Sequence, residues 1–567
     1  MSEISKGLAN GLTNYGDPEF AKYLRRSFAK SMGYTNESLD KPIVGICYTE
    51  SGFNNCHRHF PEMLEAVKRG VLASGALPMP FPMISLGEVF LSPTSMVYRN
   101  LMAMAVEEMI RAQPMDAVVL MGGCDKTVPA LLMGAVSAGK PAVMLVAGPM
   151  MTGRYKGERL GACTDCRRFW AQYRAGTISQ QEIDQIEGNL AVTSGTCAVM
   201  GTASSMAVIA ETLGVMLPNT ASIPAVHADR LRASEQTGAL AAKMAIQGGP
   251  KLEQLITEKS VENALRVLLG VSGSTNAMIH LTAIAGRAGV EVDLKRFNEL
   301  SDETPVLVDL KPVGTGYMED FHAAGGLDGV LRALASQLNL QTLDVTGQNL
   351  EQRLKQEQAE TTDLSVIRNT QNPVDAQGGL IALHGTLAPE GAILKRAAAT
   401  SSLLEHEGRA VVFSSLEDLA ARIDSPDLDV NADDILVLQN AGPRSPSGMP
   451  EAGYLPIPKK LAKVGVKDMV RISDARMSGT AFGTIVLHVT PEADLGGPLA
   501  LVQNGDRIRL SAAAKTIDLL VTPEELERRR CALPPSSTPP SRGYRKLYHD
   551  TILPAPQGCD FDFLVPN

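Results

Sequence analysis

Basic side chains, cysteines and long apolar runs are all scarce in this chain of 567 residues. Its 53 lysines and arginines are outnumbered by 62 aspartates and glutamates, so the formal net charge is −9. Because no long basic run offsets this acidity, nucleic acid is not expected as a partner. The eight cysteines are too few for a disulfide scaffold in a chain of this length, so we expect thiols, core residues or metal ligands.

Segments for membrane insertion or secretion are also missing. Apolar stretches such as Ala142–Ala147 are far shorter than a membrane span, and Met1–Gly16 lacks the apolar core of a signal peptide. We therefore expect a cytoplasmic protein without a membrane partner. A composition of 44% hydrophobic and 20% charged residues, with 51 glycines, is typical of a folded globular protein. The length predicts two or more cores.

Residues 1–360 are expected to form an N-terminal α/β domain, because short apolar runs alternate with helix-like segments there. Three runs are interpreted as buried parallel strands: Pro42–Cys47, Asp116–Met121 and Ala142–Ala147. The segments between them are expected to be helices: Phe60–Ser74, Val97–Arg111 and Pro129–Ala138. This alternation predicts a parallel sheet flanked by helices on both faces.

A polar stretch, Leu350–Asn372, ends at Pro373 and is the predicted linker. Beyond it, residues 373–567 are expected to form a mostly β, barrel-like or sandwich C-terminal domain. Its apolar runs are separated by Gly, Pro and Asp: Gly379–Leu383, Ala410–Phe413, Ile435–Gln439, Met469–Ile472, Thr484–Val489 and Asp506–Leu510. The tail Cys531–Asn567 is rich in Pro, Ser and Tyr and is expected to lie over the surface.

One strand-to-helix turn carries three reactive groups in a row. Cys124, Asp125 and Lys126 follow an apolar strand, and Pro129 marks the first turn of the next helix. Ligands in α/β sheets bind at the carboxyl ends of strands, so this turn is a candidate site. Taken alone, the segment is equally well explained by a buried cysteine beside two solvated charges.

Cys56 and Cys197 lie in similar strand-end or glycine-rich turns. Three thiolates that are widely spaced in sequence suit an iron-sulfur cluster with one open iron, whereas a closed structural zinc site normally needs four ligands. The spacing itself gives no support, because none of the three cysteines belongs to a CxxC pair. The CxxC pair of the chain, Cys163 and Cys166, lacks a second pair for zinc and a thioredoxin-like context, and we interpret it as mostly structural.

Five ordered motifs extend this pattern along the chain. They are Gly123-Cys124-Asp125-Lys126-Thr127, Gly195-Thr196-Cys197 with Met200–Met206, Gly273-Ser274-Thr275-Asn276, Gly442-Pro443 with Gly448-Met449-Pro450-Glu451, and Asp474-Ala475-Arg476-Met477-Ser478-Gly479-Thr480. With them, from about Lys41 to Leu510, the chain resembles the family of dihydroxy-acid, phosphogluconate and sugar-acid (aldonate) dehydratases. The resemblance implies a hydro-lyase that removes water from a 2,3-dihydroxy carboxylate.

The resemblance also implies two inorganic cofactors. The positions that match its iron-sulfur ligands are Cys56, Cys124 and Cys197. The sugar-acid branch is similar to a 2Fe-2S type, and 4Fe-4S is the alternative. The positions that match its magnesium ligands are Glu88, Asp125, Glu451 and a carbamylated Lys126. Hard oxygen ligands suit magnesium, whereas an unmodified lysine would repel the ion; an ordinary ion-pairing lysine is the alternative for Lys126.

Ser478 matches the proposed catalytic base of the family. A serine hydroxyl is a poor base at neutral pH, so it can act only if a cation and nearby donors stabilise its alkoxide. The expected product is a 2-keto-3-deoxy acid, formed when Ser478 removes the C2 proton and the C3 hydroxyl departs. Thr480, Ser274 and His57 are expected to bind the substrate; the alternatives for His57 are orienting the cluster and packing in the core.

The expected substrate is a pentonate or hexonate. Ala475 and Met477 stand where the branched-chain amino-acid branch usually has Gly and Phe, and Ser204 stands where it has Asn. In the other direction, Asn55-Cys56-His57 departs from the Pro-Cys-Asn of sugar-acid members. The first alternative is therefore 2,3-dihydroxy-isovalerate as substrate. A non-catalytic iron-sulfur sensor or storage protein is the second, and the resemblance suggests a homodimer or homotetramer.

Overall fold

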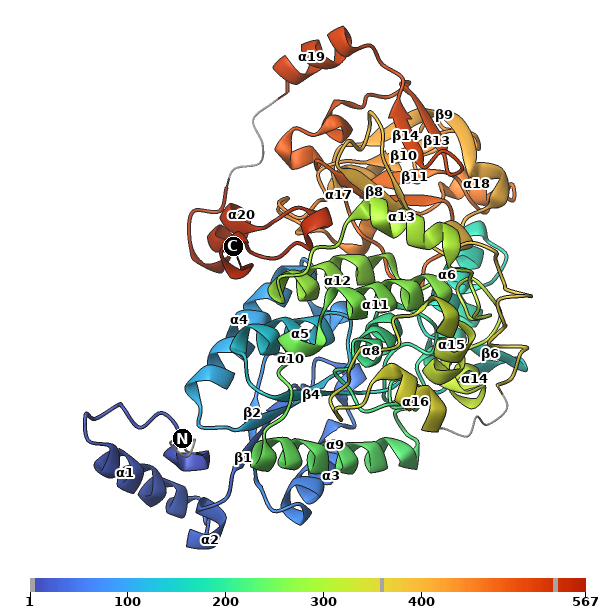
Figure 1. Cartoon of the computed structure of the whole chain (residues 1–567). Helices are drawn as coiled ribbons and strands as arrows, with labels where there is room; N and C mark the ends of the chain where they lie inside the picture. Colours follow the sequence, from blue (N-terminus) through green and yellow to red (C-terminus); the bar gives the residue numbers. More distant parts are fainter. Residues whose placement is uncertain (1–5, 357–361, 534–538, 567) are drawn as a thin grey trace.

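The computed structural model describes residues 6–356, 362–533 and 539–566. Figure 1 shows two large sheets, one in the first third of the chain and one in the last third, with a large helical layer between them. A third sheet is the two-stranded pair of β5 (Gly153–Tyr155) and β6 (Glu158–Leu160). Among the described residues, no helix is long and apolar enough to cross a membrane. The predicted α/β class, with a barrel-like C-terminal part, is confirmed.

The N-terminal sheet has four parallel strands in the order β2-β1-β3-β4. Their bounds are β1 Ile43–Tyr48, β2 Leu77–Pro82, β3 Ala117–Gly122 and β4 Ala142–Val146. β3 and β4 are apolar and fully buried, as expected for strands covered on both faces. Helices α3 and α9 cover one face, and α5, with α4 packed on it, covers the other (Figure 1).

Strand β2 was not predicted, because prolines occupy every second position of Leu77–Pro82. Proline cannot donate to a sheet ladder, so it is restricted mainly to edge strands. β2 is the edge of this sheet and pairs with β1 alone. The prolines therefore interrupt no backbone hydrogen bonding on the outer side of β2, where none of the described strands pairs with it. The chain continues from β2 toward Glu88.

Helices fill the rest of the first two-thirds of the chain. Those around the sheet are α3 Phe60–Ala73, α4 Met96–Ala112, α5 Thr127–Ala138, α8 Thr202–Thr212 and α9 Ala228–Gln247. Those between the two sheets or beside them are α6 Thr164–Ala175, α7 Gln180–Leu190, α11 Glu258–Gly270, α12 Thr275–Arg287, α13 Leu294–Glu303, α14 Met318–Ala323 and α15 Gly326–Ala333. Part of the predicted linker is helical, as α16 Leu350–Gln356, and residues 357–361 lie outside the described residues.

The C-terminal sheet has eight strands in the order β14-β13-β9-β10-β11-β12-β8-β7. Their bounds are β7 Ile381–Leu383, β8 Gly391–Leu394, β9 Glu405–Phe413, β10 Ile435–Leu438, β11 Arg471–Ser473, β12 Ile485–Thr490, β13 Arg507–Ser511 and β14 Thr516–Leu519. The four central strands are parallel and the outer ones antiparallel. His384, next to β7, exchanges backbone hydrogen bonds with Lys515 and Ile517, so the two edges of the sheet meet and nearly close a barrel.

The tail differs from the expectation of a surface segment. After α20 (Gly543–Thr551), Asp560 is buried and forms an ion pair with the buried Arg287 of α12. Arg99 of α4 donates hydrogen bonds to the carbonyls of Gly558 and Cys559. Buried charges are tolerated when paired in this way. The tail is therefore anchored to the N-terminal half by these polar groups, and also by apolar packing of Cys559 near Met96 and of Phe561 near Val97.

Candidate functional site

All four strands of the N-terminal sheet direct site residues to one edge. The segment after β1 carries Cys56, the one after β2 carries Glu88, and the one after β3 carries Cys124. The segment after β4 pairs with the chain before Cys197, because Met150 N–H donates to Thr196 O at 2.8 Å. Parallel strands all end at the same edge, so the topology brings together residues that lie far apart in sequence.

The three predicted cluster cysteines lie close together. The Cys124 thiol lies close enough to Cys56 to act on its ionisation, and both lie near Cys197. The neighbouring Cys124 thiol, together with burial, raises the pKa of Cys56 well above its ordinary value. Thiols with raised pKa values are protonated at neutral pH, so a metal that binds here must displace protons. Three sulfur donors at one partly enclosed point fit an iron-sulfur cluster.

His57 uses both ring nitrogens within the chain. Its Nδ1 lies 2.7 Å from Thr49 O, and its Nε2 accepts a hydrogen bond from Cys124 N–H at 3.1 Å. The ring is fully buried and stacks on Phe60, and burial lowers its pKa to about 4. A neutral histidine fixed in this way orients the Cys124 turn. This favours the predicted role of His57 in orienting the cluster over its predicted role in substrate binding.

Three carboxylates lie beside the thiols. Ligand oxygens of Glu88, Asp125 and Glu451 are all within 4.8 Å of one another, which is compact enough to surround one cation. Asp125 links the carboxylates to the thiols, because its charge also contributes to the raised pKa values of Cys56 and Cys197. Glu451 comes from the loop after β10, so the second sheet completes the set.

Lys126 lies among these carboxylates without a hydrogen bond. Its ammonium nitrogen is fully buried, 3.6 Å from Asp125 Oδ2 and 3.7 Å from Glu88 Oε2. Among the described residues, no acceptor forms a hydrogen bond with it. A buried polar atom without a partner normally signals a missing ligand or water. The position fits a lysine whose nitrogen carries a carboxylate and so becomes a fourth oxygen donor to magnesium.

Arg476 is a site residue that the sequence motif contained but to which we gave no role. It is fully buried and donates to Glu88 Oε1 and Glu451 Oε1, both at 2.7 Å. Burial acts to raise the pKa of Glu88, but the charges of Arg476 and Lys126 outweigh it and hold that pKa at about 2. Arg476 therefore joins the two halves of the chain through the carboxylates and keeps Glu88 ionised.

Replacing Arg476 with methionine is expected to lower the stability of the metal-free protein by about 3 to 5 kcal/mol, because two partly buried carboxylates lose their closest cationic partner. Thermal unfolding measures the change. The control is Arg507→Met, which removes an exposed ion pair with Glu407 and is expected to cost less than about 1 kcal/mol. Equal shifts for the two variants would contradict the role given to Arg476.

The loop after β11 brings Ser478 to the N-terminal half. Ser478 Oγ lies 2.8 Å from Thr480 Oγ1, and both side chains are buried. A Cβ on Gly479 would lie 2.5 Å from Ser274 Cβ, so this position needs glycine for the close approach. Lys395, which the sequence did not single out, donates to Gly479 O at 3.3 Å and holds the loop.

Ser274 has a structural task at the start of α12. Its hydroxyl accepts a hydrogen bond from Asn276 N–H and lies 2.8 Å from Thr202 Oγ1. Three buried polar atoms of α12 lack a partner within the described chain, Thr275 Oγ1, Asn276 Oδ1 and His280 Nε2, and so does Thr127 Oγ1 at the start of α5. These atoms can recognise a polar ligand, since each needs a hydrogen bond that the protein does not supply.

Two further buried carboxyl groups lie behind the loop that carries Glu451. Asp474 accepts hydrogen bonds from the N–H groups of Ala441 and Ala493, and Glu492 accepts from Arg444 N–H. Burial raises the pKa of Asp474 to about 6 and that of Glu492 to about 8, the latter helped by the charge of Asp474.

We expect the free energy of unfolding to fall as the pH rises from 5 to 8, and we expect Glu492→Gln to make this fall smaller. The folded protein keeps the Glu492 proton up to about pH 8, whereas the unfolded chain releases it near the ordinary value of 4.5. Unfolding therefore releases a proton in this window, and rising pH favours the unfolded state. Thermal unfolding at three pH values measures the slope. An identical slope in the variant would contradict a raised Glu492 pKa.

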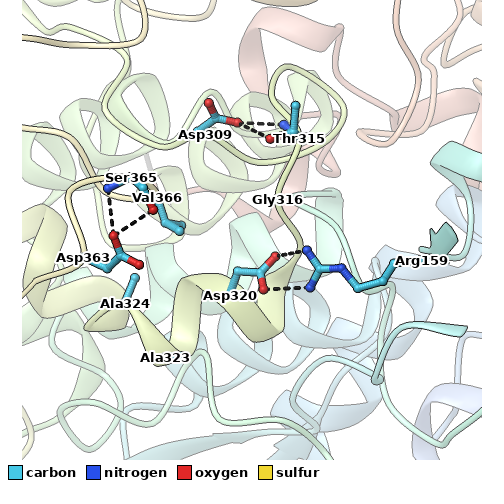
Figure 2. Close-up of a pocket in the computed structure, with 10 residues that line it drawn as sticks. All are labelled: Arg159, Asp309, Thr315, Gly316, Asp320, Ala323, Ala324, Asp363, Ser365 and Val366. Carbon is cyan, nitrogen blue, oxygen red and sulfur yellow. Dashed lines mark hydrogen bonds and ion pairs between the residues drawn. The ribbon is translucent and has the colours of Figure 1, made fainter. Parts of the chain in front are cut away.

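A separate cavity of about 550 Å³ contains none of the predicted site residues. Figure 2 shows that its polar side chains already pair with one another: Arg159 with Asp320, Asp309 with Thr315, and Asp363 with Ser365. Its lining offers no thiol or cluster of unpaired carboxylates among the ten residues drawn. The thiol and carboxylate site, rather than this cavity, has the groups required for chemistry.

The chain matches known proteins along most of its length. Residues 41–353 match the family described as dihydroxy-acid/6-phosphogluconate dehydratase N-terminal, and residues 365–559 match its C-terminal counterpart. It is 46% identical to a putative dehydratase IlvD1 of Rhizobium meliloti, with 97% of this chain and 96% of the relative covered. It is 45% identical to an L-arabonate dehydratase of Azospirillum brasilense, with the same coverage.

A dihydroxy-acid dehydratase of Clostridium botulinum is more distant, at 34% identity over 95% of this chain and 98% of the relative. Matches of this extent cover both sheets and every predicted ligand position. The chain therefore belongs to the dihydroxy-acid/6-phosphogluconate dehydratase family, and it is a hydro-lyase acting on 2,3-dihydroxy acids.

Proposed function

We propose that this protein is an iron-sulfur and magnesium-dependent dehydratase that converts an aldonic sugar acid into a 2-keto-3-deoxy acid. The observation that carries the proposal is the contact between two donor sets of different chemistry. Three thiols and three carboxylates adjoin through Asp125, and the Ser478 loop reaches them from the other sheet. Soft and hard donors side by side suit two different metals acting on one substrate.

The cofactors would be held by residues already placed. Cys56, Cys124 and Cys197 are the proposed cluster ligands, and Glu88, Asp125, Glu451 and carbamylated Lys126 are the proposed magnesium ligands. When bound, magnesium supplies positive charge to the substrate carboxylate and C2 oxygen, and an open iron supplies a Lewis acid to the C3 hydroxyl. We further propose a 2Fe-2S cluster.

Ser478 performs the proton transfer in this scheme. It removes the C2 proton, the C2–H electrons form the C2–C3 double bond, and the C3 hydroxyl departs with a proton as water. The enol then tautomerises to the ketone. Thr480 donates a hydrogen bond that favours the Ser478 alkoxide, at the 2.8 Å separation seen between the two hydroxyls. Burial of both side chains excludes water from the reacting atoms.

The proposed substrate class, an aldonic acid, is supported by the buried polar atoms of α12 that lack a partner among the described residues. A pentonate or hexonate carries extra hydroxyls, which can satisfy Thr275 Oγ1, Asn276 Oδ1 and His280 Nε2. A branched alkyl substrate would leave these atoms unsatisfied, at a cost of about 1 to 3 kcal/mol each. Two relatives, the L-arabonate dehydratase and a 6-deoxy-6-sulfo-D-gluconate dehydratase of Pseudomonas putida at 44% identity, also carry names of sugar-acid enzymes.

A substrate panel tests the proposal. Anaerobically purified protein with magnesium is assayed for 2-keto acid formation on pentonates, hexonates and 2,3-dihydroxy-isovalerate. We expect kcat/KM for at least one aldonate to exceed that for 2,3-dihydroxy-isovalerate by 10-fold or more, equivalent to about 1.4 kcal/mol. A preference for 2,3-dihydroxy-isovalerate would assign the chain to the branched-chain reaction instead.

Lys126→Ala is expected to lower activity at limiting magnesium by more than about 100-fold, because even the loss of an outer-shell partner costs about 10- to 100-fold in metal affinity. A short carboxylate such as acetate should restore part of the activity by occupying the vacated space. The control Lys126→Arg retains a positive charge and should not respond to acetate. Full activity of Lys126→Ala without acetate would contradict a carbamylated ligand.

A further inference from the structure

The CxxC pair interpreted as structural from the sequence lies against a proposed cluster ligand. Cys163 Sγ is 3.1 Å from Cys197 Sγ, and Cys166 Sγ donates a hydrogen bond to Cys163 O at 2.9 Å. The three cysteines therefore follow one another in space in the order Cys197, Cys163, Cys166. Packing alone would not require this order.

The turn that presents Cys163 is fixed at every position. Cys163 itself has φ 79°, a left-handed conformation that is uncommon outside glycine. Thr164 Oγ1 donates to Thr480 O at 2.9 Å, which ties the turn to the proposed catalytic loop. Asp165 is buried and held by Lys311 Nζ, Tyr317 and Gly161 N–H. This framework holds the Cys163 sulfur against Cys197 at a cost in backbone strain.

The cysteines of the first contact are less buried than the other two proposed cluster ligands. Cys163, Cys166 and Cys197 are partly exposed residues, whereas Cys56 and Cys124 are buried. In an iron-sulfur protein the ligand thiol that solvent reaches is the one most at risk of irreversible oxidation when the cluster is lost. Cys197 is that ligand here, and the two additional thiols adjoin it rather than the buried pair.

We propose that Cys163 and Cys166 form a thiol relay that keeps Cys197 reversibly oxidisable and returns it to the reduced state. The relay rests on the proposed role of Cys197 as a cluster ligand. It acts on the iron-free chain, when Cys197 is not shielded by metal, and its oxidant is hydrogen peroxide. It adds a protective function to the site and assigns a task to a motif that the dehydration reaction does not use.

The chemistry of the relay balances in two steps. Peroxide first oxidises one thiol of the Cys163 and Cys197 contact to a sulfenic acid and releases water. The second thiol displaces the hydroxyl as another water, so one S–S bond and two water molecules replace two thiols and one peroxide. The Cys166 thiol then attacks Cys163 Sγ. A Cys163–Cys166 disulfide forms, the Cys163–Cys197 bond breaks, and the Cys166 proton passes to Cys197.

Peptide mapping distinguishes the two disulfides. Trypsin releases residues 160–167, which contain Cys163 and Cys166, separately from residues 175–230, which contain Cys197. After peroxide treatment of iron-free protein and blocking of free thiols, wild type should give an unblocked 160–167 peptide lighter by two hydrogen atoms. Cys166→Ser should instead trap the 160–167 peptide cross-linked to 175–230.

Reconstitution measures the protective effect. After peroxide and then dithiothreitol, wild type and the exposed-thiol control Cys531→Ser should regain iron, while Cys163→Ser should regain several-fold less and show Cys197 as sulfinic acid. If the blocking reagent labels both Cys163 and Cys166 completely in oxidised wild type, no disulfide has formed there and the relay is overturned.

The relay is also overturned if the Cys163→Ser variant, purified without oxygen, never binds as much iron as wild type, because Cys163 would then be a ligand. If wild type purified without oxygen contains no iron, the cluster proposal is refuted. Peptide mapping would still show whether the relay disulfides form.

Discussion

Ser478→Ala is expected to lower the dehydration rate by about 10²- to 10⁴-fold, the range that a positioned acid or base contributes. The alanine cannot accept the C2 proton, and Thr480 loses the oxygen that lies 2.8 Å from its own. The visible spectrum, iron content and magnesium content should stay at wild-type levels, because Ser478 is not among the proposed ligands. KM should change little, since the lost interaction is made mainly in the transition state.

The matched control for this variant is Ser301→Ala. Ser301 is also a buried serine, and its hydroxyl donates to Leu380 O at 2.7 Å rather than to a predicted site residue. Its loss should reduce thermal stability by about 1 kcal/mol and leave kcat unchanged. If Ser478→Ala keeps both its spectrum and full activity, Ser478 is not the base.

Cys124→Ser is expected to abolish colour, iron binding and activity together. Cys124 is the central thiol of the site, because it lies near the Cys56 thiol and its N–H donates a hydrogen bond to His57 Nε2. A serine hydroxyl is a hard donor that does not replace thiolate on iron. Anaerobic purification, followed by iron analysis and absorbance, measures the effect, and the iron found per wild-type chain separates 2Fe-2S from 4Fe-4S.

The control for Cys124→Ser is Cys47→Ser in β1. Cys47 is a fully buried thiol of the sheet core and has no part in the proposed site. This variant loses some stability through an added buried hydroxyl but should keep iron and colour. An active, colourless and iron-free wild-type preparation would exclude the cluster altogether.

The two halves of the site differed in how readily the sequence revealed them. Cys124, Asp125 and Lys126 are adjacent in sequence, and the strand before them and the helix after them both form as predicted. Arg476 was visible in the motif around Ser478, but nothing local indicates that it reaches Glu88, 388 residues away. Lys395 has no sequence signal, because it is a single lysine at the end of a short strand.

The surroundings of the CxxC pair were not readable from the sequence. Its spacing suggested a metal or redox motif, and we interpreted it as mostly structural because the chain has no second pair for zinc and no thioredoxin-like context. Its partner in the structure is Cys197, brought to 3.1 Å by the pairing of the 148–150 segment with Thr196. A contact of this kind depends on how two turns pack, and the hydrophobic pattern of either turn is the same whether or not they meet.

The sequence by itself determined the alternation of strands and helices, the change to a β-rich second half and the set of candidate site residues. These follow from local periodicity, turn chemistry and ordered motifs, which require no knowledge of distant contacts. The tertiary structure alone decided which residues meet. Parallel strands from both sheets end at one place, and there Arg476 pairs with carboxylates of both halves and Cys163 contacts Cys197. Such meetings are set by the packing of whole elements, on which local sequence has little influence.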